Sequence, residues 1–137
     1  MDITLKQKPK PKKHIMNNHV EFLDYIASLA EDIAKTTTDR EEIYDLVWEY
    51  ADSSEHVIYY GKAHDLVHLV RNWDSSLYND AEEEVEDLFC RSDVMTYDKH
   101  ATVLAFCIIR IELTRKVEEL IKEREASEEL AAEIANA

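Results

Sequence analysis

The chain has 137 residues, of which 45% are apolar, and a formal net charge of −14. That length suits one domain, and that share of apolar residues is enough to form a core. It contains one glycine, and its two prolines, Pro9 and Pro11, lie near the start. Because β-rich folds place Gly and Pro at many turns, the composition excludes a turn-rich all-β fold and favours helices.

No segment approaches the ~20 consecutive apolar residues of a membrane span, and the basic N-terminus lacks the apolar stretch of a secretory signal. We therefore expect a cytoplasmic protein with no membrane partner. The two cysteines, Cys90 and Cys107, are expected to be free thiols, since cytosolic cysteines usually stay reduced.

The charge is divided unevenly along the chain. Residues 1–13 contain five lysines and one acid, whereas residues 14–137 contain 29 Asp or Glu against 11 Lys or Arg. The proline-spaced sequence KQKPKPKK favours extended, solvated chain, so we predict a flexible basic tail over 1–17 and a single acidic helical domain over 18–137. The tail is a leader without a role, a polybasic arm that touches nucleic acid or an acidic surface, or a segment that folds back on the protein's own carboxylates.

Apolar residues recur at spacings of three and four over 19–35 and predict a first helix. Its expected inner face consists of Val20, Leu23, Ile26, Leu29, Ala30 and Ile33. A threonine run then ends that helix. Thr38 with Glu41 has the spacing of a capping box, which predicts a second helix from Thr38 to about residue 51.

Ser53 and Ser54 end the second helix and provide a new N-cap, which predicts a third helix over 55–72. Gly61 lies inside this helix and costs about 1 kcal/mol relative to alanine, which indicates a close crossing with another helix at that point.

A fourth helix is predicted over 76–89, a loop over 90–96 and a last helix over 97–125. The segment 101–113 of this last helix is apolar nearly all round, which is typical of the centre of a bundle or of an oligomer interface. Residues 126–137 either continue the helix or fray. The pattern thus predicts an all-α fold: about five helices in a compact bundle with a long C-terminal helix.

The aromatic residues are a further pattern with two interpretations. They are Trp48, Tyr50, Tyr59, Tyr60 and Trp73. A platform on which bases stack is one use of such residues, but so acidic a chain repels phosphates. We therefore expect these side chains to pack in the core.

His64 and His68 are separated by one helical turn and can share a metal ion. The zinc-protease motif has Glu after its first histidine, whereas this chain has Asp65. No third ligand follows at a recognisable spacing, so we expect helix-surface or half-buried histidines and no metal, with a metal site as the alternative.

Acidic pairs at a spacing of three are candidates for Mg²⁺ binding, since such carboxylates face the same way on a helix. They are Glu42 with Asp45, Glu83 with Glu86, and Glu84 with Asp87. Similar pairs on two facing helices are used by nucleotide pyrophosphohydrolases of the MazG type. A solvated acidic face is the simpler interpretation.

Two segments carry acids with almost no balancing cation. Residues 39–55 hold seven acids against Arg40 alone, and residues 74–98 hold nine against Arg91 alone. The candidate partner-binding residues are Glu41, Glu42, Asp45, Glu49, Asp52, Asp80, Glu82, Glu83, Glu84, Glu86 and Asp87. Carboxylates on successive helical turns imitate the regular charges of DNA, which DNA-binding proteins match with Lys and Arg.

Some of these residues also carry a resemblance to a known family. Glu41-Glu42-Ile43-Tyr44-Asp45-Leu46-Val47, then Ala51-Asp52 and then Tyr59-Tyr60, resemble a stretch of the Ocr family of phage antirestriction proteins, with an insertion before Tyr59. Asp98-Lys99 leading into Ile108-Ile109-Arg110-Ile111 is similar to the start of that family's long dimer-forming helix. The chain departs from the family in its basic leader and in its less acidic end, ELAAEIANA.

The resemblance implies an all-helical dimer that mimics bent duplex DNA and blocks type I restriction–modification enzymes, with Glu41, Glu42, Asp45 and Asp52 among its surface acids. We therefore expect an inhibitor, without a cofactor, that occupies the DNA-binding site of a defence complex in an infected bacterial host. We also expect a homodimer through the helix 97–125, and nucleic-acid contact only through the basic tail. The alternative function is a Mg²⁺-dependent nucleotide pyrophosphohydrolase.

Overall fold

The computed structural model describes residues 18–89 and 97–136. Within these ranges the chain forms six helices and no strand: α1 (His19–Thr36), α2 (Arg40–Asp52), α3 (Glu55–Ile58), α4 (Tyr60–Trp73), α5 (Ser75–Phe89) and α6 (Tyr97–Ala135). The predicted all-α bundle with a long last helix is confirmed. The predicted tail 1–17 and loop 90–96 lie outside the described residues.

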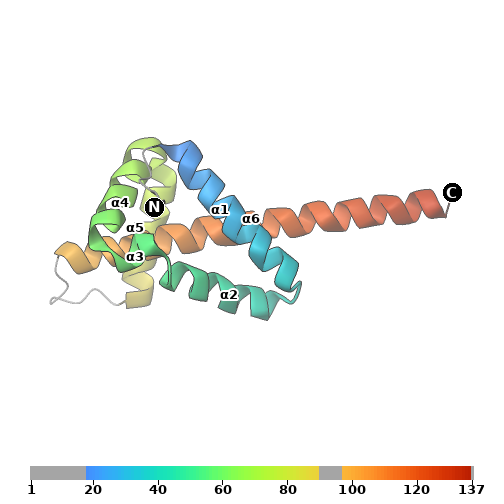
Figure 1. Ribbon diagram of the computed structural model, residues 1–137, viewed down its shortest axis with the longest axis horizontal. Helices are drawn as coiled ribbons and strands as arrows, with labels where there is room; N and C mark the ends of the chain where they lie inside the picture. Colours follow the sequence, from blue (N-terminus) through green and yellow to red (C-terminus); the bar gives the residue numbers. More distant parts are fainter. Residues whose placement is uncertain (1–17, 90–96, 137) are drawn as a thin grey trace, which may run out of the picture.

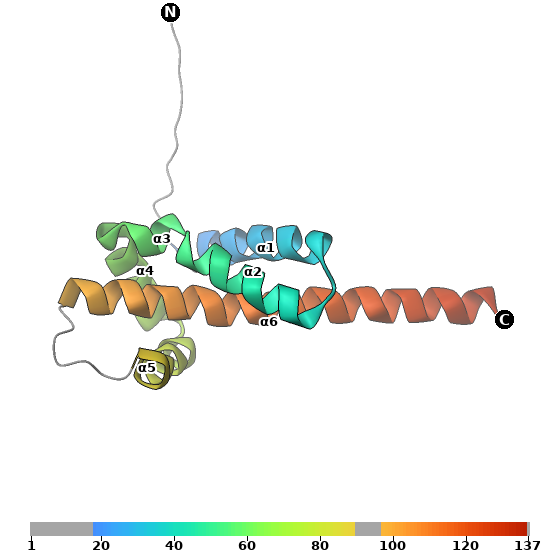
Figure 2. The same ribbon diagram turned by 90° about the horizontal axis from the view of Figure 1, so that it is seen from below.

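Helix α6 is the axis of the fold. It has 39 residues, and each of the other five helices packs against it. Figure 2 shows α1, α2 and α3 on one side of α6 and α5 on the other, while Figure 1 shows the end of α6 projecting beyond them all. No described helix has a segment both long enough and apolar enough to cross a bilayer.

The core is built around the apolar segment of α6. Leu104, Ile108, Ile109 and Leu113 are almost completely buried there. The other helices contribute Phe22 and Ile26 from α1, Val47 from α2, Leu66 from α4 and Leu77 from α5. Residues 101–113 are therefore the centre of the bundle, covered by helices of the same chain.

The start of α2 differs by one residue from the prediction. The carboxylate of Asp39 accepts hydrogen bonds from the backbone N–H groups of Glu41 at 2.8 Å and Glu42 at 3.4 Å. Asp39 is thus the N-cap, and the predicted capping box of Thr38 with Glu41 is wrong. A carboxylate is a strong N-cap acceptor, and it also complements the positive end of the helix dipole.

The predicted third helix, 55–72, is divided in two. Tyr59 has an extended backbone, with φ −98° and ψ 113°, and separates α3 from α4. Ser54 caps α3 as predicted, accepting a hydrogen bond from the N–H of His56 at 3.2 Å. Gly61 lies in the exposed first turn of α4, and a Cβ added there would meet nothing within 4 Å. The predicted close crossing at Gly61 is therefore wrong.

The inner face of α1 agrees with the prediction at Ile26, Ala30 and Ile33, which are buried, and differs from it near the start of the helix. Val20 and Leu23 are exposed, whereas Phe22 is completely buried. Phe22 packs edge-on against Trp73 of α4, with ring centroids 6.1 Å apart. Helix α1 packs mainly against α6 and more lightly against α4, and the spacing of aliphatic residues alone does not reveal that Phe22 belongs to the buried face.

We expect Ile108→Ala to lower the free energy of unfolding by about 2–5 kcal/mol, because it leaves a cavity at the bundle centre. Urea denaturation followed by circular dichroism measures this loss. The matched control is Leu130→Ala on the projecting part of α6, where the side chain is 58% exposed and the change should stay within about 0.5 kcal/mol. Equal losses at the two positions would contradict the assignment of the core.

Burial raises the pKa of the Cys107 thiol from 9.0 to about 12. As the pH rises above 9, the thiol ionises in the unfolded chain before it does so in the folded protein. The contribution of Cys107 to the free energy of unfolding is therefore complete below pH 9 and decreases as the pH rises toward 12. We expect the stability difference between Cys90→Ser and Cys90→Ser/Cys107→Ala to shrink over that interval in urea titrations. A difference that stays constant would show that Cys107 ionises as freely in the fold as in the unfolded chain.

Candidate protein-binding surface

Five of the predicted acids form one continuous line on α2, which we call the α2 stripe. Its members are Glu41, Glu42, Asp45, Glu49 and Asp52, and all five are exposed. At 3.6 residues per turn they fall within an arc of roughly 100° around the helix axis. The opposite face carries the buried residues Ile43, Val47 and Ala51. Packing of that apolar face on α6 therefore turns the stripe toward solvent.

The charge density of the α2 stripe is close to that of a nucleic-acid strand. From Glu41 to Asp52 the helix rises roughly 17 Å at about 1.5 Å per residue. Five carboxylates over this length give about one charge per 3–4 Å, and one DNA strand has about one per 3.4 Å. The stripe therefore offers a basic surface a comparable row of negative charges.

The described residues do little to neutralise the α2 stripe. Within residues 18–89 and 97–136, no Lys or Arg forms an ion pair with any of its five carboxylates. Arg40, the one cation on α2, lies 3.8 Å from Glu118 of α6. Glu42 accepts a hydrogen bond of 3.0 Å from the hydroxyl of Thr37, which orients it without changing its charge.

Asp32 of α1 lies beside α2 and was not among the predicted partner-binding acids. The Tyr50 hydroxyl donates to Asp32 of α1 at 3.4 Å. Desolvation first, and then the negative charges of Asp32 and Glu49, raise the pKa of Tyr50. The short connection Thr37–Asp39 in the sequence indicates that α1 lies beside α2, because helices joined by so few residues pack antiparallel.

The predicted acids of α5 are divided between two faces of that helix. Glu84 forms an ion pair with Arg110 of α6, and the two side chains are only 23% and 11% exposed. Asp80 contacts Arg115 of α6 at 2.8 Å. Both flank the inward residues of α5, whereas Glu82, Glu83, Glu86 and Asp87 are exposed. The first two acids therefore help attach α5 to α6 and are less available to a partner.

The two acidic surfaces are separated by α6. Within the described chain, α2 and α5 do not contact one another, and α6 lies between them in Figure 2. The pair Glu42 and Asp45 is thus on a different side of α6 from Glu83 and Glu86. No group of three or more His, Cys, Asp or Glu among the described residues is arranged to hold a metal ion.

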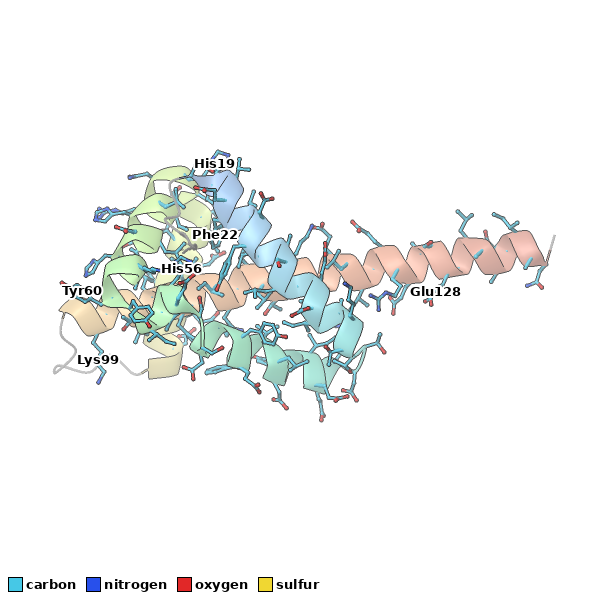
Figure 3. The ribbon with its side chains drawn as sticks, viewed as in Figure 1. His19, Phe22, His56, Tyr60, Lys99 and Glu128 are labelled. Carbon is cyan, nitrogen blue, oxygen red and sulfur yellow. The ribbon has the colours of Figure 1, made fainter. Side chains whose placement is uncertain are left out.

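The two candidate metal ligands lie on α4. The half-buried His64 packs edge-to-face with Tyr60, with ring centroids 5.4 Å apart, and His68 is exposed one turn further on. Figure 3 shows Tyr60 at the start of α4. His64 thus packs against an aromatic ring of its own helix.

The aromatic residues do not all join the core. Tyr59 and Tyr60 are 60% and 56% exposed, so the expectation of core packing is wrong for this pair. The extended backbone at Tyr59 turns the junction of α3 and α4 outward. Trp48, Tyr50 and Trp73 are partly buried against the core, as expected.

A hollow of about 270 Å³ lies at the end of the α2 stripe. It is lined by Trp48, Asp52, Val57, Thr102, Val103 and Phe106, and so lies between the end of α2, α3 and the start of α6. Trp48 forms one wall, with its ring centroid 4.9 Å from that of Phe106. Asp52 is both a member of the stripe and part of the hollow's lining.

Comparison of the chain with protein-family models, with curated proteins and with solved structures gave no match. The arrangement of the chain's own side chains is therefore what indicates its function.

We expect Arg110→Met to destabilise the fold by on the order of 2–4 kcal/mol, because it leaves the Glu84 carboxylate largely buried without its partner. The double variant Glu84→Leu/Arg110→Met should recover most of that loss, since no charge is left unpaired. Denaturant titrations measure both.

The control for this pair is Arg115→Met, whose ion pair with Asp80 is about half exposed and should contribute less than about 1 kcal/mol. A loss at Arg110 no larger than the loss at Arg115 would show that the Glu84 pair is as solvated as an ordinary surface pair.

Proposed function

We propose that this protein is an acidic DNA mimic that occupies the nucleic-acid-binding site of a host defence complex, with a type I restriction–modification enzyme as the first candidate. The observation that carries the proposal is the α2 stripe: five exposed carboxylates on one rigid helix, without a cationic partner among the described residues. Its inhibition would be competitive with duplex DNA.

The physical basis of such competition is electrostatic. A DNA-binding cleft presents Lys and Arg at positions that match phosphates, and the loss of condensed counterions favours its binding to DNA. A helix with a similar row of charges can fill the same cleft through steering and charge complementarity. Because the charges of α2 are fixed by a packed helix, the mimic loses little conformational entropy on binding.

The exposed acids of α5 supply a second negative surface. Glu82, Glu83, Glu86 and Asp87 lie on the other side of α6 from the α2 stripe. Duplex DNA likewise presents charge on more than one side. In this proposal α5 extends the contact beyond the stripe, while Asp80 and Glu84 mainly attach α5 to α6.

The alternative hydrolase stays a separate prediction. It requires acids of α2 and α5 to bind a common Mg²⁺, and these helices are not in contact in the described chain. A screen of nucleoside triphosphates with Mg²⁺ tests it. Turnover that is abolished by Glu83→Gln would replace the mimic proposal with this one.

The homodimer through residues 97–125 also stays a prediction. The apolar segment of that helix is covered within the chain, and the large apolar side chains of α6 that are exposed among the described residues are Leu130 and Ile134, further along. Sedimentation equilibrium determines whether two copies associate.

We expect the variant Glu41→Gln/Asp45→Asn/Glu49→Gln to inhibit DNA cleavage by a purified type I restriction enzyme roughly 10- to 100-fold less than the wild type does, because it removes three charges of the α2 stripe. The matched control is Glu128→Gln/Glu129→Gln/Glu133→Gln, which makes the same change in net charge on the projecting end of α6 (Figure 3). This control should inhibit like the wild type.

The binding of wild-type protein to the enzyme, measured by fluorescence anisotropy, should weaken steeply as salt increases. Binding that is independent of salt would contradict the mimic, as would equal effects of the stripe variant and its control. Failure to inhibit this enzyme at all would remove type I restriction enzymes as the target.

A further inference from the structure

The hollow at the end of the α2 stripe, which we call the Trp48 pocket, combines an aromatic wall with an anionic rim. Trp48 and Asp52 are separated by four residues on α2, so the indole and the carboxylate lie on adjacent turns of the same side of the helix. Val57, Val103 and Phe106 complete the apolar lining. Among the residues that the structure describes, the lining includes no Lys or Arg.

Two features of the pocket define the chemistry of its ligand. The carboxylate of Asp52 is exposed and has no cationic partner among the described residues. The hydroxyl of Thr102 donates its proton to the carbonyl of Lys99 at 2.9 Å, so its oxygen is oriented as an acceptor. The pocket therefore offers acceptors and a π-face, and suits a ligand that is cationic, flat and rich in N–H donors.

We propose that the Trp48 pocket receives an arginine side chain of the partner protein. A guanidinium is planar and weakly hydrated, stacks on aromatic rings and donates two parallel hydrogen bonds to a carboxylate. A lysine ammonium is strongly hydrated and has no flat face. At about 270 Å³, the pocket is smaller than the roughly 300–1,000 Å³ typical of small-molecule sites, which favours a single side chain.

The position of the pocket gives it a role in the proposed function, on which this inference rests. Asp52 is the last member of the α2 stripe, so a basic partner surface aligned along the stripe reaches the pocket at its end. The stripe attracts many arrangements of positive charge, whereas the pocket accepts one side chain in one orientation. The pocket thus fixes the register of the partner on α2.

The experiment uses two unstructured Gly/Ser peptides of equal length and charge, one with evenly spaced arginines and one with lysines. Each is titrated into the full-length ¹⁵N-labelled protein, and the indole N–H resonance of Trp48 and the amide resonance of Thr102 are followed by NMR. We expect the arginine peptide to bind about tenfold more tightly and to shift both resonances.

Two isosteric variants distinguish specific binding in the Trp48 pocket from general electrostatic attraction by the α2 stripe. Asp52→Asn should abolish the preference for arginine. Asp45→Asn removes the same charge about two helical turns away and should weaken the binding of both peptides equally, leaving the preference for arginine intact. Thermal melting confirms that both variants are folded.

Equal affinity for the two peptides, or shifts confined to α2 residues 41–47 with Trp48 unmoved, would contradict the arginine pocket but leave competition by the stripe intact. Arginine-selective binding without inhibition of DNA cleavage would overturn the choice of enzyme and leave the pocket intact. The two proposals can therefore fail independently.

Discussion

The burial of one apolar segment organises the whole molecule. Residues 101–113 of α6 have apolar side chains nearly all round the helix, and such a segment is stable in water only when other helices cover every side of it. The five other helices do this. Each covering helix must turn its own apolar face inward, so its outward face is determined by the same packing. The acidic surfaces are thus a consequence of how α6 is covered.

The same packing separates acids that hold the fold together from acids left for a partner. On α5, Glu84 lies beside the inward residues and pairs with Arg110, the charge that interrupts the apolar part of α6. On α2, the apolar residues occupy one side and the acids the other, so the carboxylates stay in solvent. Repulsion along α2 has a cost in stability, which the burial of Ile43 and Val47 offsets.

Local patterns were enough to predict the helices and some of their ends. Ser54 could be identified as a cap from its neighbours, because capping depends on residues close in sequence. The break at Tyr59 could not, because no proline marks it in the sequence. The inward turn of Phe22 could not either, since Phe22 packs against Trp73, which is distant in the chain. For the same reason the sequence showed that α5 is acidic but not that Asp80 and Glu84 face arginines of α6.

Helix α6 is continuous, but its two parts are stabilised differently. Up to about Ile121 its side chains pack on the bundle, whereas every described residue from Lys122 onward is exposed. Arg124 still donates a hydrogen bond to the carbonyl of Ala34 in α1 at 3.1 Å. The turns beyond Arg124 depend on intrinsic helix propensity, which is marginal in water. Backbone amides of this end should therefore exchange with deuterium far faster than those near Ile108. A single helix is therefore expected to contain, within the described residues, both strongly protected turns and turns that fray readily.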